Sequence, residues 1–134
     1  MSVFLDACIV IYLVEANEAF SHQIATAMQA SGPTLFCVSD LVRLECLVGP
    51  LRANDTDRRA AYGQQFEVLR VLEITREVFD LAAHLRARHG LKTPDALHTA
   101  TAIHHGCAEL WTGDGRLAAI GDRIKVRVFG GVRP

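Results

Sequence analysis

Residues 92–102 read KTPDALHTATA, and this stretch predicts how the C-terminal part of the chain folds. Thr93 suits a helix cap and Pro94 suits the first helical position. Asp95 then falls in the first turn, where the positive end of the helix dipole favours an acid. We expect the helix to run to His105. A short apolar run follows it, so the stretch predicts a helix that leads into a strand.

The same alternation of apolar runs and helical patterns fills the rest of the chain. The expected strands are residues 3–5, 34–38, 71–74, 110–112 and 125–129. The expected helices are residues 8–15, 17–31, 39–48, 56–70, 75–89, 93–105 and 117–120. Strands separated by helices predict an α/β fold of three layers, α/β/α, with a central, mainly parallel sheet. Such sheets bind ligands at the carboxyl ends of their strands.

Local signals also mark individual element ends and one sheet edge. Ser39 is expected to cap its helix, and Gly49 with Pro50 is expected to end it. Thr75 is expected to cap the helix that follows the third strand. Glu73 lies within that strand, and a charge there indicates an edge position.

The composition favours one globular domain, residues 1–134, with ample apolar material for a core. Half of the residues are hydrophobic and 22% are charged. The longest apolar run, residues 7–14, is too short to span a bilayer, and the N-terminus has no signal-peptide pattern. We therefore expect a cytoplasmic protein without membrane contact. The net charge of −1 neither favours nor excludes a polyanionic substrate.

The cysteines indicate a reduced protein. There are four, and none forms a CxxC pair; they are Cys8, Cys37, Cys46 and Cys107. Each lies in an apolar stretch, which predicts buried free thiols rather than a disulfide framework.

Four acids fall where this fold places a functional site. Asp6 directly follows the first expected strand and Asp114 follows the fourth. Asp95 begins a helix, and Glu45 lies about two turns into the helix after the second strand, among apolar neighbours. Because the carboxyl ends of parallel strands lie at one edge of a sheet, we expect these side chains to converge.

A cluster of carboxylates indicates a bound cation. Two carboxylates 4 Å apart repel by roughly 4 kcal/mol at an effective dielectric constant of 20. Oxygen ligands without Cys or His favour Mg²⁺ or Mn²⁺ over zinc, and such sites suit phosphoryl transfer. Each acid alone has a simpler interpretation: Asp95 as a helix start, Asp114 as a turn residue, Asp6 as a cap. Glu45 is the hardest to explain by structure alone.

Four segments of the chain resemble the PIN domain family in order and spacing. These segments are residues 3–15, 38–45, 92–102 and 110–114. They cover nearly the whole chain, and the third is the most specific. The compact size, with no appended domain, resembles the VapC-type toxins of bacterial and archaeal toxin–antitoxin pairs.

The resemblance implies an endoribonuclease that depends on Mg²⁺ or Mn²⁺ and serves as the toxin of a type II toxin–antitoxin pair. It carries over the four acids as catalytic metal ligands and Thr112 as a supporting hydroxyl; the acids are Asp6, Glu45, Asp95 and Asp114. It also implies a homodimer, a cognate antitoxin protein and an RNA substrate. The chain departs from the family pattern at Cys8, Gly113 and Thr99.

Other interpretations remain open at this point. A PIN fold that binds RNA or protein without cleavage would share every pattern described so far. A receiver-like phosphoaspartate domain fits less well, because Thr75 and Arg76 follow the third strand where that fold needs other groups. His98 shares a helix face with Asp95, so it could contact metal or substrate, or be simply a hydrogen-bonded or an exposed histidine. Lys92 and Arg116 are the best candidates for contacts with phosphates.

Overall fold

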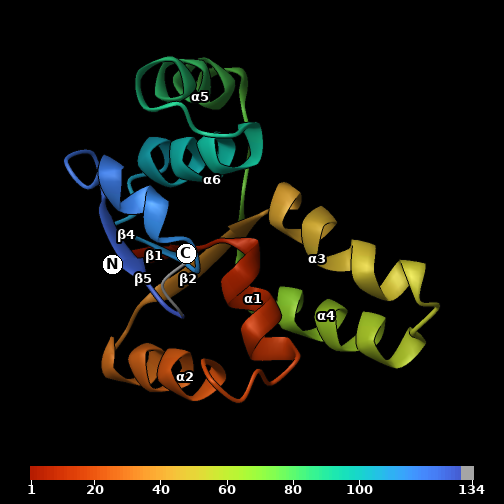
Figure 1. The fold of residues 1–134 in the computed structure, drawn as a ribbon. Coiled ribbons are helices and arrows are strands. Elements are labelled where there is room, and N and C mark those ends of the chain that lie inside the picture. The colour runs from red at the N-terminus through yellow and green to blue at the C-terminus, as the bar shows by residue number, and fades with distance from the viewer. Residues whose placement is uncertain (131–134) are drawn as a thin grey trace.

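The computed structural model describes residues 1–130, and five parallel strands form one sheet at its centre (Figure 1). The strands are β1 (Ser2–Leu5), β2 (Leu35–Ser39), β3 (Arg70–Leu72), β4 (Glu109–Thr112) and β5 (Lys125–Val128). Their order is β3-β2-β1-β4-β5, so β1 is the middle strand and β3 lies at an edge. The predicted edge position of the third strand is thereby confirmed.

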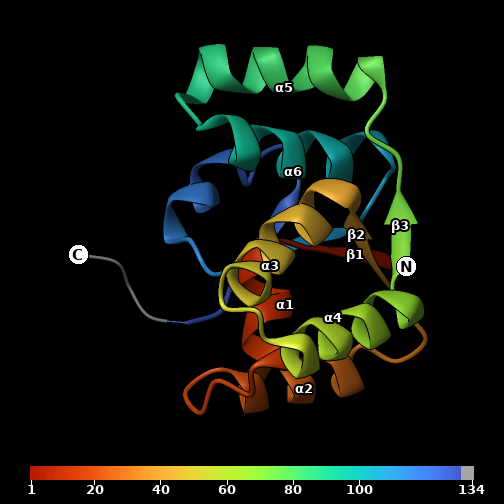
Figure 2. The ribbon, with the colours of Figure 1, turned by 90° about the vertical axis from the view of Figure 1, so that its right-hand side faces the viewer.

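Helices cover both faces of the sheet. They are α1 (Ala7–Val14), α2 (Ser21–Ala30), α3 (Asp40–Arg52), α4 (Thr56–Val68), α5 (Arg76–His89) and α6 (Thr93–His104), with a 3₁₀ helix, η1 (Gly115–Ile120). Figures 1 and 2 show α5 and α6 on one face and α1, α2 and α4 on the other. The predicted three-layer α/β/α architecture is confirmed. The predicted domain reaches residue 134, and residues 131–134 lie outside the described part of the chain.

The middle strands form the centre of the core. Val3, Phe4 and Leu5 of β1 are fully buried, as are Leu110 and Trp111 of β4. Strands covered on both faces read as continuous apolar runs rather than as an alternation. This burial fixes the position of β1 and therefore the direction in which the chain leaves it at Asp6. None of the helices in the described residues is long and apolar enough to cross a membrane.

The expected end of the third helix at Gly49 and Pro50 is wrong, because α3 continues through both to Arg52. Val42, Cys46 and Pro50 are its buried residues, spaced four apart on one face. Packing of this face keeps the helix intact although proline removes one backbone hydrogen bond.

Other local signals are confirmed or shifted by a residue. The hydroxyl oxygens of Ser39 and Thr75 accept N–H bonds at the starts of α3 and α5, as predicted. At α6 the capping residue is Lys92 instead of Thr93, and no side-chain bond closes that end.

The cysteines are all free, but the prediction of burial fails for Cys8. On α1 the fully buried residues are Ile9 and Val10, which leaves Cys8 on the solvent side of the helix. The other three thiols are buried.

Candidate metal centre

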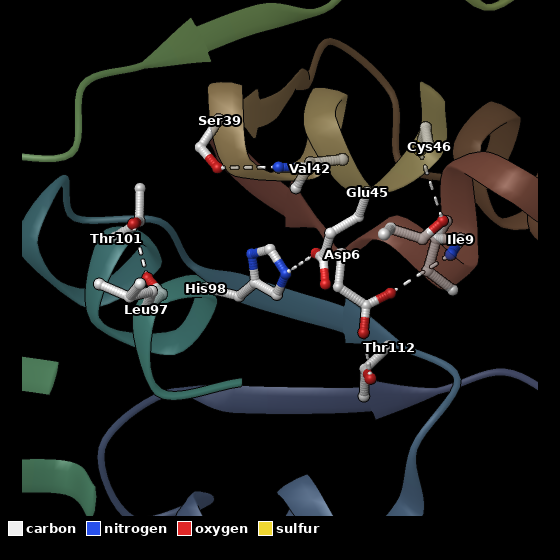
Figure 3. A network of polar contacts seen from close by, with 11 residues as sticks. Asp6, Ile9, Ser39, Val42, Glu45, Cys46, Leu97, His98, Thr101 and Thr112 are labelled. Atoms are coloured by element: carbon white, nitrogen blue, oxygen red, sulfur yellow. Dashed lines mark hydrogen bonds and ion pairs between the residues drawn. The ribbon is translucent and has the colours of Figure 1, made fainter. Parts of the chain in front are cut away.

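The carboxylate of Asp6 lies in the middle of the C-terminal edge of the sheet, directly after β1. The residue is 5% exposed. Its Oδ1 accepts the backbone N–H of Ile9 at 3.3 Å, which caps α1, and its Oδ2 accepts the hydroxyl of Thr112 from the end of β4 (Figure 3). Burial raises the pKa of Asp6 to about 6, although the bond from Thr112 opposes that rise.

The carboxylate of Glu45 enters the same space from α3. Its Oε1 lies 2.6 Å from Nε2 of His98, a residue of α6 (Figure 3). The side chain of His98 is 4% exposed and that of Glu45 is 30% exposed. This contact therefore joins α3 to α6 at the acidic site.

Asp114 lies after β4 and is bound by a nearby arginine. Nη2 of Arg116 is 2.6 Å from Oδ2, and Nε is 3.0 and 3.1 Å from the two carboxylate oxygens. These bonds from Arg116 lower the pKa of Asp114. The backbone N–H of Asp114 donates to Oγ1 of Thr112 at 3.0 Å. Thr112 thereby links Asp114 to Asp6 through its hydroxyl group.

Asp95 is the least satisfied of the four acids. It lies in the first turn of α6, and within residues 1–130 no hydrogen bond or ion pair reaches its carboxylate. Burial raises its pKa, and the negative charge of Asp114 raises it further. A half-buried carboxylate that repels its neighbour fits a place where a cation is to bind.

The four acids act on a common volume. Partial desolvation by the surrounding protein, and then the charges of Asp6, Glu45, Asp95 and Asp114, raise the pKa of the Cys8 thiol to about 12. In the part of the chain that the structure describes, no three His, Cys, Asp or Glu side chains form a ready-made metal cluster. The donor set, four carboxylates with one left unpaired, fits a hard divalent cation by its chemistry. To bind such a cation, the Asp114 carboxylate would exchange its bonds from Arg116 for the metal.

Two departures from the family pattern lie against each other. A Cβ atom added at Gly113 would lie 3.1 Å from Cβ of Cys8 and 3.1 Å from the hydroxyl oxygen of Tyr12. A larger residue at position 113 would therefore require Cys8 or Tyr12 to move by a few tenths of an ångström.

Two contacts of the site were beyond the sequence patterns. His98 lies three residues after Asp95, which suggested a shared helix face, but nothing indicated Glu45 as its partner. The sequence indicates Arg116 as a contact for RNA phosphates, and nothing in its spacing predicts the ion pair that its guanidinium makes with Asp114. Thr99, a position that departs from the family, is fully buried and its hydroxyl has no partner within the described residues.

Comparison with known proteins decides the family. The PIN domain model matches residues 3–123. The chain belongs to the PIN domain family. The resemblance inferred from the four sequence segments is thereby confirmed. No curated protein matches the chain significantly.

Solved structures share the fold of this PIN domain over almost its full length. VapBC2 from Rickettsia felis, bound to a DNA fragment from its promoter, is 16% identical with a TM-score of 0.78, covering 96% of this chain and 99% of that one. A toxin–antitoxin complex from Klebsiella pneumoniae is 23% identical with a TM-score of 0.77, covering 94% and 96%. VapC20 from Mycobacterium tuberculosis, a toxin that cleaves the sarcin–ricin loop, is 24% identical with a TM-score of 0.72, covering 93% and 98%.

Proposed function

We propose that this PIN domain is the toxin of a type II toxin–antitoxin pair, and that it cleaves RNA with the help of Mg²⁺ or Mn²⁺. The observation that carries the proposal is the group of four carboxylates at the C-terminal edge of the sheet, with Asp95 unpaired among the described residues. Four acids whose charges act on one volume repel one another, and this repulsion lowers stability unless a cation offsets it.

Each side chain has a distinct part in the proposed reaction. A bound divalent cation would activate the attacking water and stabilise the leaving oxygen of the phosphodiester. The carboxylates that would hold it are Asp6, Glu45, Asp95 and Asp114. Thr112 holds the orientation of the Asp6 carboxylate by its hydrogen bond.

The proposed partners are an RNA substrate, a cognate antitoxin protein and a second copy of the chain. The structures that share the fold include complexes of toxin with antitoxin and a toxin that cleaves an RNA loop, which supports this proposal. Lys92, exposed at the start of α6, lies close enough to Asp114 for its charge to lower the pKa of that carboxyl. With Arg116, it offers positive charge to the phosphates of RNA beside the acids.

Asp6→Asn tests the proposal most directly, because the substitution keeps the shape of the side chain and removes its charge. We expect RNA cleavage to fall at least a hundredfold, since a metal ligand is lost, and growth inhibition in the host to disappear. Asp80→Asn is the matched control, an exposed acid on α5 away from the site, and should cleave at the wild-type rate. Cleavage that survives both Asp6→Asn and EDTA would overturn the assignment.

The second candidate is a PIN-fold module that binds RNA or protein without cleavage. One observation favours it: the Asp114 carboxylate is bound by Arg116 through both oxygens. A purified sample incubated with RNA and Mn²⁺ separates the two functions. RNA fragments support the nuclease, whereas a gel shift without fragments supports the module.

A further inference from the structure

We propose that His98 is a positioning residue, which holds the Glu45 carboxylate so that one of its oxygens faces the cation. The inference rests on the proposed function, since it concerns the same metal site. Its evidence is separate: it is a contact between two side chains of the protein.

The contact is built from two helices that are far apart in sequence. Glu45 reaches the site from α3 and His98 from α6, and Nε2 lies 2.6 Å from Oε1. Figure 3 shows the imidazole and the Glu45 carboxylate pointing toward each other, above the Asp6 carboxylate. Because His98 is almost fully enclosed, its ring has little freedom to turn away.

The rest of the ring makes no other hydrogen bond in the part of the chain described. Nδ1 is buried and has no partner, and the ring packs against Phe4 with the two centroids 5.9 Å apart. A buried polar atom left unpaired lowers stability, so an apolar residue would fill this volume better. We infer that position 98 is a histidine because its ring makes this hydrogen bond to Glu45.

The bond leaves the two oxygens of Glu45 in different situations. Oε1 accepts the hydrogen bond from His98, and because an ionised carboxylate can only accept, Nε2 carries the proton of that bond. Oε2 is left for another partner. Metal-ligating carboxylates are commonly oriented by such hydrogen bonds, and loss of the orienting group typically weakens metal binding about 10- to 100-fold.

A double-mutant cycle measured by Mn²⁺ calorimetry tests whether His98 acts through Glu45. We expect His98→Ala to weaken Mn²⁺ binding about 10- to 100-fold. In a Glu45→Gln background the same substitution should have no further effect, because the group it positions is already altered. His98→Gln, whose amide can donate to Glu45, should recover part of the affinity.

Thr101→Val is the control for general damage to α6. Thr101 is fully buried on the same helix, and we expect this substitution to leave Mn²⁺ affinity unchanged. A readout without metal is the NMR signal of the His98 ring. We expect a proton on Nε2 in the wild-type protein, and a clear shift of that signal in Glu45→Gln. This measurement also serves if His98→Ala fails to fold.

The outcomes separate the inference from the function beneath it. If the wild-type protein binds no Mn²⁺, the proposed metal site fails. If the wild type binds Mn²⁺ and both His98→Ala and His98→Gln bind it with wild-type affinity, the positioning role is overturned. If His98→Ala weakens Mn²⁺ binding in the Glu45→Gln background as much as it does in the wild type, His98 acts independently of Glu45. This result also overturns the inference. A His98 ring signal unchanged by Glu45→Gln would do the same.

Discussion

Glu45 and Asp114 lie on two sides of the acidic site, and each carboxylate meets a basic side chain of a different kind. His98 is buried, comes from a distant helix and takes one oxygen of Glu45. Arg116 is 70% exposed, lies two residues from Asp114 and takes both oxygens. Exposed ion pairs contribute little, about 0–1 kcal/mol, whereas a buried contact is fixed by the packing around it. The contact between His98 and Glu45 is therefore fixed by the packing of the fold, whereas Asp114 can exchange Arg116 for another partner.

The largest effect should come from replacing the two acids in turn. We expect Glu45→Gln to lower kcat/KM of RNA cleavage by about a hundred- to a thousandfold, because the carboxylate that His98 holds in position is lost. Asp114→Asn should cost about tenfold, because that carboxylate must first release Arg116. Single-turnover cleavage of one RNA by both variants measures this. A larger loss for Asp114→Asn than for Glu45→Gln would reverse the comparison.

A second test uses the opposite pKa shifts of Asp6, which is buried, and Asp114, which is partly buried. Burial raises the pKa of Asp6 from 3.8 to about 6, so the folded protein binds this proton more tightly than the unfolded chain. Its contribution to stability is complete below pH 3.8 and is lost as pH rises through 6. The total loss is up to about 3 kcal/mol. Asp114, with a lowered pKa, contributes in the opposite sense: its stabilisation is present above 3.8 and is lost as pH falls.

We therefore expect Asp6→Asn to be more stable than the wild type at pH 8, by up to about 3 kcal/mol, and to match it near pH 3.8. Cleavage should rise with pH through about 6, as Asp6 loses its proton. Urea unfolding at several pH values measures the first effect and initial cleavage rates measure the second. A stability difference independent of pH would show that burial does not hold the Asp6 pKa up.

The smallest effect should come from Arg116→Gln. Because the guanidinium competes with the cation for Asp114, its removal should tighten Mn²⁺ binding by about two- to fivefold. Arg76→Gln makes the same change of charge at the start of α5, remote from the acids, and should bind Mn²⁺ like the wild type. Calorimetry at low salt gives both values. Weaker binding in Arg116→Gln would mean that the arginine supports the site instead of competing for it.

The sequence was informative where a local signal determines the structure. Apolar runs located the five strands, and the acids that follow β1 and β4 were expected at one edge. Ser39 and Thr75 cap their helices as predicted, since a cap depends on neighbours within one turn.

The sequence patterns fail where contacts between residues far apart in the chain determine the structure. The packed face of α3 carries Pro50 inside the helix, against the local rule. The bond from His98 to Glu45 joins residues 53 positions apart, which spacing along one helix cannot reveal. The pairing of Arg116 with Asp114 depends on how the chain turns after β4, and a charge pattern alone fits several partners.

Cys8 gives the site an intrinsic chemical reporter. It is the exposed thiol of the four, and the surrounding protein and carboxylates raise its pKa to about 12. Alkylating reagents attack the thiolate, so this sulfur reacts slowly while the acids keep their full negative charge. A cation that offsets that charge makes the thiolate easier to form. If the proposed cation binds, the rate of Cys8 labelling would rise with its occupancy of the acidic site in the unaltered protein, with no RNA present.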